Sequence, residues 1–198
     1  MKTPVIFILV LLLSAILNAQ PGTYTDSLKK FRDNYISTHE VIREKDRARL
    51  QFYPISGEYH IAARVERIYE APWFAMETSG RLKKNFRVYA ILHFSFGGRS
   101  MKLSVYQSQQ LMDTEEYKDY LFVPFTDLTN GEETYENGRY IDLTTGGLQQ
   151  ENFYIDFNRA YNPYCAYISN MYNCPIPPKE NSLQVSVRAG EKKFGAAL

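Results

Sequence analysis

The spacing of hydrophobic residues changes once along the chain, near Pro54. Before this point, Leu28, Phe31 and Tyr35 are separated by three and four positions, which places them on one face of a helix. After it, apolar and polar residues tend to alternate, as they do in strands that are buried on one side. The pattern predicts an N-terminal helix followed by a chain that is mainly β.

The clearest predicted strand covers residues 86–96. Its apolar positions are all expected on one face: Phe86, Val88, Ala90, Leu92, Phe94 and Phe96. Gly97-Gly98 follows as a two-residue turn of the primed type, which requires positive φ. Shorter strands are predicted at 58–68, 101–105, 121–125, 140–143, 153–157 and 183–187, and a long irregular segment at 158–182. This succession predicts an antiparallel barrel or sandwich with a long irregular C-terminal segment.

Residues 1–19 form a separate unit of the sequence. A basic start at Lys2, an apolar run from Val5 to Leu17 and a small residue at Ala19 are the three parts of a signal peptide. The apolar run is shorter than the ~20 residues that a membrane-spanning helix needs. We expect cleavage after Ala19, with an uncleaved anchor as the alternative. The remaining residues 20–198 then form one β-rich domain, periplasmic or secreted, without a membrane span.

Export bears on the two cysteines, Cys165 and Cys174. In an oxidising compartment, this spacing favours a local disulfide. Two buried thiols, or a reactive or metal-bound thiol, remain as alternatives. A zinc site needs about four ligands, and the three histidines are scattered away from both cysteines. No metal or cofactor is therefore expected.

Composition narrows the classes of partner. Lys and Arg number 23, and Asp and Glu number 22. Because the leader contains Lys2 and no other charged residue, its removal leaves a neutral chain. Such a chain is a poor candidate for binding nucleic acid by charge. The aromatic content is high and consists mostly of tyrosine and phenylalanine, with 16 Tyr and 12 Phe against one Trp.

Two acidic residues are candidates for catalysis. Ile141 and Leu143 are expected to face the core, which turns Asp142 to the other side of its strand. Ile155 is also expected to face the core, which turns Asp156 to the other side of its own strand. If these two strands pair in a hairpin, the carboxylates are neighbours and can act in acid–base catalysis. Alternatively, each carboxylate accepts hydrogen bonds from loop amides or from an arginine, in a purely structural role.

The same region contains side chains suited to a polar ligand. The candidate ligand-binding residues are Arg139, Tyr140, Asn158, Tyr161, Asn162 and Asn181. Their amides, hydroxyls and rings can bind a small polar ligand such as a glycan. A hydrolase that uses Asp142 and Asp156, and a structural envelope protein, are the alternatives. The chain has no G-x-S-x-G, H-E-x-x-H, P-loop or dinucleotide motif.

Several motifs resemble the bacterial family called domain of unknown function 1684. They include GRYIDL at 138–143, DFNRAYNP at 156–163, CAY at 165–167, CPIPPKEN at 174–181 and AGEK at 189–192. The resemblance covers about residues 46–194, and it departs from the family pattern at Tyr164 and Gln184. It implies that the motif residues Arg139, Asp142, Asp156, Asn158, Tyr161, Cys165, Cys174 and Asn181 are shared. It implies no reaction.

Overall fold

The computed structural model describes residues 21–195, with side chains from residue 24 onward. The predicted signal peptide therefore lies outside the described residues. The helices are α1 (Pro21–Thr38) and α2 (Gln109–Met112). The strands are β1 (His60–Arg67), β2 (Phe74–Met76), β3 (Lys84–Phe96), β4 (Arg99–Ser108), β5 (Tyr120–Phe125), β6 (Arg139–Thr144) and β7 (Tyr154–Asp156). The short 3-10 helices cover Glu44–Arg49, Gly57–Tyr59, Gly147–Gln149, Phe157–Arg159, Tyr164–Ala166 and Lys179–Asn181.

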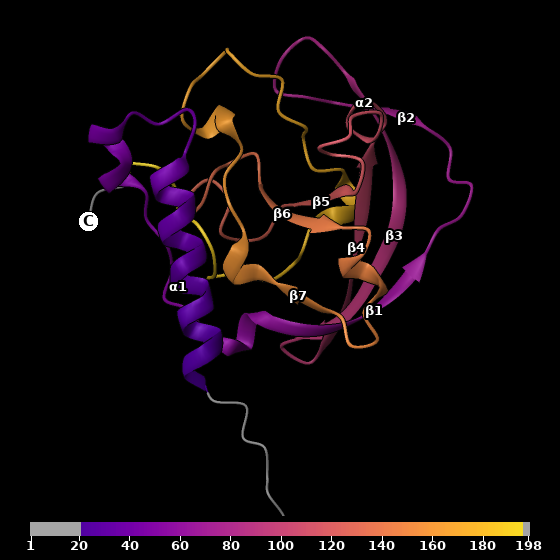
Figure 1. Cartoon of the computed structure of the whole chain (residues 1–198), viewed down its shortest axis with the longest axis horizontal. Coiled ribbons are helices and arrows are strands. Elements are labelled where there is room, and N and C mark those ends of the chain that lie inside the picture. The colour runs from indigo at the N-terminus through magenta and orange to yellow at the C-terminus, as the bar shows by residue number, and fades with distance from the viewer. Residues whose placement is uncertain (1–20, 196–198) are drawn as a thin grey trace, which may run out of the picture.

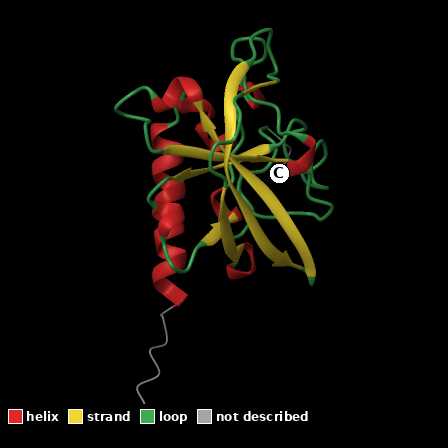
Figure 2. Ribbon diagram, turned by 90° about the vertical axis from the view of Figure 1, so that its right-hand side faces the viewer, coloured by secondary structure: helices red, strands yellow, loops and turns green. Residues whose placement is uncertain are grey.

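The strands form one strongly curved antiparallel sheet. Their order is β6-β5-β4-β3-β1-β7, and β2 pairs with the start of β3. The sheet makes a nearly closed barrel, with α1 packed along one side (Figures 1 and 2). The predicted mainly β, antiparallel fold with an N-terminal helix is confirmed, and the barrel is favoured over the sandwich. The predicted irregular segment at 158–182 is confirmed, and up to residue 195 the structure continues after β7 in short 3-10 helices, isolated bridges and irregular segments.

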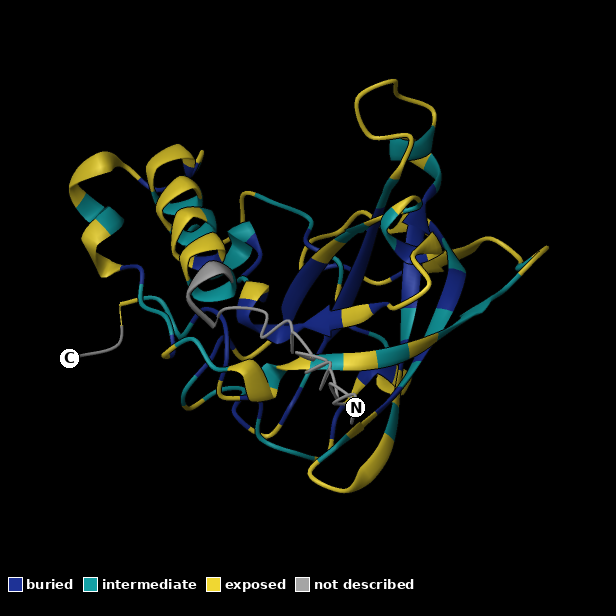
Figure 3. Ribbon diagram, turned by 60° about the horizontal axis from the view of Figure 1, so that its bottom comes forward, coloured by how far each residue is buried: buried dark blue, intermediate teal, exposed yellow. Residues whose placement is uncertain are grey.

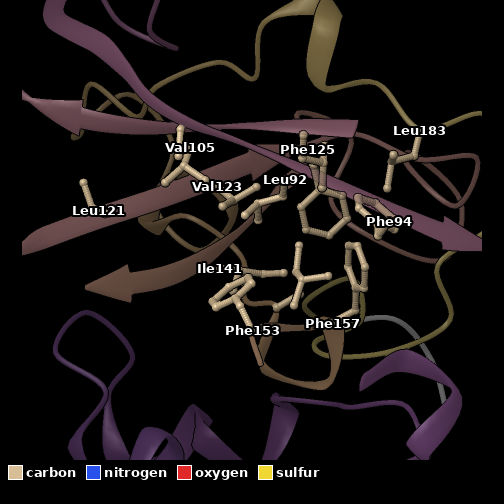
Figure 4. Packing of buried hydrophobic residues seen from close by; sticks show 14 of the residues in the cluster. Leu92, Phe94, Val105, Leu121, Val123, Phe125, Ile141, Phe153, Phe157 and Leu183 are labelled. Carbon is tan, nitrogen blue, oxygen red and sulfur yellow. The ribbon is translucent and has the colours of Figure 1, made fainter. Parts of the chain in front are cut away.

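The barrel interior contains the main hydrophobic core. Leu92, Val105, Val123 and Ile155 are fully buried there, and Ile141 is almost so (Figure 4). Most buried positions lie on the sheet and on the segments that cross its ends, whereas α1 exposes much of its surface (Figure 3). At ~25 cal/mol per Å² of apolar area, burial of this kind is the main favourable contribution to folding.

A β-bulge changes the predicted face of the strand at 86–96. The register between β3 and β4 shifts between Val88 and Ala90, so Tyr89 is an extra residue. After the bulge, Ala90 and the following apolar positions face the interior. Before it, Phe86 and Val88 pack in a second cluster with Phe122 and Tyr140. The prediction of a single apolar face was wrong, because an unpaired residue reverses the alternation.

The predicted hairpin between residues 140–143 and 153–157 is also wrong. β6 pairs with β5, and Asp142 lies opposite Phe122. β7 pairs with β1, and Asp156 lies opposite His60. The two strands stand at opposite ends of the strand order, so their carboxylates are not cross-strand neighbours. The proposed final strand at 183–187 also does not form, although Leu183 and Val187 are buried.

The buried guanidinium of Arg139 attaches the C-terminal segment to the barrel. It donates to the backbone carbonyls of Val187, Ala189 and Glu191, at 2.8, 2.5 and 3.2 Å. It also forms an ion pair of 2.7 Å with Asp127, and both side chains are fully buried. These bonds satisfy carbonyls that have no strand partner. Arg139 is therefore a structural residue, which contradicts its prediction as a ligand-binding one.

Gly190 allows the same segment to approach the barrel closely. Its φ is +74°, and a Cβ there would collide with the carbonyl oxygens of Ala160 and Phe157. Glu191 then donates its backbone N–H to the Ala160 carbonyl at 2.8 Å. A side chain at position 190 would break this contact and strain the backbone.

Cys165 and Cys174 form a disulfide, as predicted. The bridge links the 3-10 helix at Tyr164–Ala166 to the stretch at 174–176, which pairs with residues 77–79 directly after β2. In residues 21–195, no helix combines the length and the apolar character needed to cross a bilayer.

The Arg139–Asp127 pair generates a test of this fold. Asp127→Asn leaves a buried guanidinium without its counter-charge, and we expect a loss of about 3–5 kcal/mol in the free energy of unfolding. Arg64→Ala removes an exposed charge 3.7 Å from Glu66 and should change stability little. Urea unfolding measures both. An Asp127→Asn variant as stable as the wild type would contradict the assigned role of Arg139.

A candidate ligand cavity around Asp142

A cavity of about 550 Å³ opens on the outer face of β5 and β6. Tyr120, Phe122, Tyr140 and Asp142 form its floor, together with Tyr161 from the segment after β7. The face-switching bulge adds Phe86 from β3. Phe31 and Tyr35 of α1 close one side. The cavity therefore lies between the barrel, the helix and the irregular C-terminal segment.

Backbone hydrogen bonds to Tyr140 hold Tyr161 in the cavity floor. Tyr161 and Tyr140 exchange N–H···O bonds of 3.0 and 2.9 Å, although their segments are not in one regular strand pair. The two rings stand almost perpendicular, with centroids 5.9 Å apart. Tyr140 also donates its hydroxyl to the Pro175 carbonyl. This bridge anchors the C-terminal segment beside β6, where the Tyr161 hydroxyl can reach Asp142.

Asp142 is the acidic group of the cavity. Its Oδ1 accepts hydrogen bonds from the hydroxyls of Tyr161 at 2.6 Å and Tyr120 at 2.8 Å. Its Oδ2 has no hydrogen-bond partner among residues 21–195. The side chain is accessible from the cavity mouth, while protein atoms surround it on its other sides. One carboxylate oxygen is therefore satisfied, and the other is open to a ligand.

The surroundings of Asp142 keep both phenols protonated. Burial raises the pKa of Asp142, and the hydrogen bonds from Tyr161 and Tyr120 partly oppose this rise. Burial also raises the pKa of both tyrosines well above its usual range, helped by the nearby Asp142 charge. The two hydroxyls thus remain donors, with their protons directed at Asp142.

Two cations line the cavity, and neither compensates Asp142. Lys84 has a pKa lowered by desolvation alone, without any influence from a carboxylate. Arg159 lies 3.5 Å from Asp156 and over the Phe31 ring. Neither forms an ion pair with Asp142. The cavity thus combines one carboxylate with cationic groups placed elsewhere on its wall.

The disulfide-bonded loop forms another wall of the cavity. Tyr164, Tyr172, Asn173, Cys174 and Pro175 line the cavity on this side. The rings of Tyr164 and Tyr172 lie 5.2 Å apart, which joins the two ends of the loop. Ser79 pairs with Cys174 through its backbone N–H, at 2.9 Å from the Cys174 carbonyl oxygen. The disulfide therefore helps to hold one wall of the cavity in place.

A second carboxylate, Glu191, is fully buried and bonds Tyr35, which lines the cavity. Its two oxygens accept from the Tyr167 hydroxyl at 2.7 Å, and Oε2 also accepts from Tyr35 at 3.1 Å. The backbone N–H of Asn162 donates to Oε2 at 2.9 Å. Burial raises the pKa of Glu191 to about 7, against the effect of these donors. The network ties α1 to the C-terminal segment through Tyr35.

The structure brings only part of the predicted site together. Asp142, Tyr140 and Tyr161 line the cavity. The amides of Asn158, Asn162 and Asn181 instead hold backbone groups of Ser56, Lys192, Ser104 and Pro124. Asp156 binds the Tyr24 hydroxyl and the Asn158 backbone N–H, and it does not line the cavity. These four residues meet the bonding needs of the fold itself.

Sequence reasoning missed the second phenol, Tyr120. Its position opposite Thr144 puts it on the same face as Asp142, two residue pairs along the ladder from the Phe122–Asp142 pair. In both strands every second residue faces the cavity: Tyr120 and Phe122 in β5, and Tyr140 and Asp142 in β6. The sequence contains this alternation, but only the pairing of β5 with β6 shows that these residues are neighbours. Phe31, Tyr35 and Lys84 were missed because they come from segments remote in sequence. Arg159 lies only two residues before Tyr161, but its side chain was expected to pair with a carboxylate rather than to line a cavity.

Asp142→Asn should stabilise the ligand-free protein at neutral pH. Because the folded pKa of Asp142 is raised, the folded state retains a proton that the unfolded state loses. Stability therefore falls as pH rises from about 4 through this raised pKa. The amide has no charge to desolvate, so its Tm should exceed that of the wild type above this window. Thermal unfolding at pH 4 and pH 8 measures the difference, and a lower variant Tm at pH 8 would contradict it.

Glu191→Gln should flatten the pH dependence of stability over a defined window. The wild-type free energy of unfolding should fall as pH rises from 4.5 to about 7, because the folded protein holds the extra proton there. The full loss is about 3 kcal/mol, from 1.36 kcal/mol per pKa unit. Urea unfolding between pH 4 and pH 8 gives the slope. An unchanged slope in Glu191→Gln would show that another group causes it.

The comparisons with known proteins agree with this fold. The solution structure of a protein from the archaeon Haloarcula marismortui, described as uncharacterized, is 28% identical to this chain with a TM-score of 0.66. The likeness covers 86% of this chain and 95% of the other. No curated protein matches the sequence. Residues 45–192 match the family described as "Protein of unknown function (DUF1684)". The match includes the cavity floor and the disulfide, and the chain belongs to this family.

Proposed function

We propose that this chain is an exported protein that binds a small polar ligand, such as a glycan, in the cavity around Asp142. The proposal includes cleavage of residues 1–19 and a single domain at 20–198, located in the periplasm or secreted. It includes no cofactor and no nucleic-acid partner. The open Oδ2 of Asp142, on the floor of a ring-lined cavity, is the observation on which it rests.

The size and lining of the cavity support binding. Small-molecule sites usually occupy about 300–1,000 Å³ and combine many apolar groups with a few polar ones. Here the rings of Phe122, Tyr140 and Tyr161 supply flat surfaces, and Asp142, Lys84 and Arg159 supply charged groups. Sugars present the same combination, with an apolar ring face and polar edges. This match favours a glycan over a purely apolar ligand.

The two alternatives have less support. A hydrolase that uses Asp142 and Asp156 needs both carboxylates at one site, and only Asp142 lines the cavity. A structural envelope protein needs no cavity, and a convex surface at Asp142 would have favoured it. Binding is therefore the function that the geometry supports best.

A thermal-shift titration with neutral and charged monosaccharides and disaccharides tests binding. A ligand at 100 times its Kd should stabilise the folded state by about 2.7 kcal/mol, seen as a saturable rise in Tm. Tyr161→Ala removes a ring and a hydroxyl from the floor and should abolish the rise. Tyr69→Ala is the matched control, because Tyr69 is 77% exposed and does not line the cavity.

The result that would contradict binding is equally specific. Either no sugar shifts the Tm of the wild type, or Tyr161→Ala responds as strongly as Tyr69→Ala does. Circular dichroism of both variants shows whether the fold survives, so that loss of binding is separated from unfolding.

A further inference from the structure

We propose that the ligand group that binds Asp142 is a protonated amine, so that the cavity selects amine-bearing polar ligands such as amino sugars. This inference rests on the proposed binding function and specifies its chemistry. It follows from the donors, the charges and the rings that surround the free oxygen of Asp142.

The phenol hydroxyls around Asp142 already donate to protein acceptors. Tyr120 and Tyr161 direct their hydroxyl protons at Asp142 Oδ1, and Tyr140 directs its own at the Pro175 carbonyl. A ligand group beside Oδ2 therefore meets the carboxylate oxygen and phenol lone pairs, all of which are acceptors. An ammonium group has three donors and no acceptor. A hydroxyl has one donor, and its own lone pairs would face acceptors.

Asp142 has no counter-charge from the part of the protein that the structure describes. It forms no ion pair among the described residues, and Arg159 pairs with Asp156 instead. A carboxylate that is partly surrounded by protein is stabilised by a nearby opposite charge. Lys84 and Arg159 line the same cavity without compensating it. A cationic ligand supplies the missing charge, whereas Lys84 and Arg159 can donate hydrogen bonds to oxygen atoms of the remaining ligand.

Aromatic rings surround Asp142 in the cavity. Phe122 and Tyr140 lie edge to face with centroids 5.5 Å apart, and Tyr161 stands across Tyr140. All three line the cavity next to Asp142. The electron-rich faces of aromatic rings attract cations, most strongly where water is excluded. Rings and carboxylate together make a surface that favours positive charge.

Glu191 shows what a purely structural carboxylate looks like in the same protein. It also accepts bonds from two phenols, but both of its oxygens are occupied and it does not line the cavity. Asp142 differs in both respects, since one oxygen is open and faces the cavity. An open carboxylate oxygen that faces a cavity is the arrangement we expect of a ligand-binding group.

Matched ligand pairs test the inference. Calorimetric titration at pH 7 compares glucosamine with glucose and with N-acetylglucosamine, and ethanolamine with ethylene glycol. We expect each free amine to bind at least ~10-fold more tightly than its hydroxyl or acetylated counterpart, since charged hydrogen bonds are about twice as strong as neutral ones. Asp142→Asn should remove this preference. Glu180→Gln is the matched control, because Glu180 also accepts a bond from a phenol, Tyr106, but lies outside the cavity.

The pH dependence gives a second readout. Amine affinity should rise with pH while Asp142 loses its proton, and fall again once the amine itself deprotonates. Lys84 and Arg159 are the other charged groups that line the cavity. The remaining titratable groups there are tyrosines 35, 120, 140, 161, 164 and 172. Asp142→Asn should abolish the rising limb and leave the falling one.

Each outcome decides between the two proposals. Amine preference that disappears in Asp142→Asn supports both. Binding of glucose and glucosamine with equal affinity, unchanged in Asp142→Asn, overturns the amine inference and leaves the binding function intact. No binding by any member of either pair overturns both. If Asp142→Asn does not fold, the matched pairs on the wild type still decide the amine preference.

Discussion

The buried guanidinium of Arg139 is the interaction on which the C-terminal segment depends. This segment forms only isolated bridges among the described residues, such as the one between Phe52 and Glu191, so several of its carbonyls need donors from side chains. Arg139 supplies them at Val187, Ala189 and Glu191, while Asp127 balances its charge. Glu191 is thereby placed where Tyr35 and Tyr167 can reach it. The same arrangement attaches α1, because Tyr35 of this helix bonds Glu191.

The carboxylates of Glu191 and Asp142 have different roles, one structural and one directed at a ligand. Glu191 is fully occupied by the protein and joins helix to C-terminal segment. Asp142 uses one oxygen to hold two phenols and leaves the other toward the cavity. Both carboxylates lose favourable contacts with water in the folded protein. The protein replaces these contacts at both oxygens of Glu191, but at only one oxygen of Asp142. This asymmetry supports the assignment of the cavity as a binding site.

The candidate site was only partly predictable from sequence. The alternation around Ile141 correctly placed Tyr140 and Asp142 on one face, since this depends on local geometry alone. The dense polar residues Asn158, Asn162 and Asn181 suggested a ligand, but the fold uses them itself. A long irregular segment has many unpaired backbone groups, and amide side chains satisfy them. Composition alone does not separate these two uses.

By itself, the sequence determined the features that depend on neighbouring residues: the helix face at Leu28, the positive-φ turn at Gly97-Gly98 and the short-range disulfide. The tertiary structure decided which strands pair, and so which carboxylate faces the cavity. Alternation tells which side of a strand is buried, but it does not name the partner strand. It is also reversed by one extra residue, as at Tyr89. Asp142 and Asp156 separated for this reason, and Tyr120 took the place beside Asp142 that the sequence had suggested for Asp156.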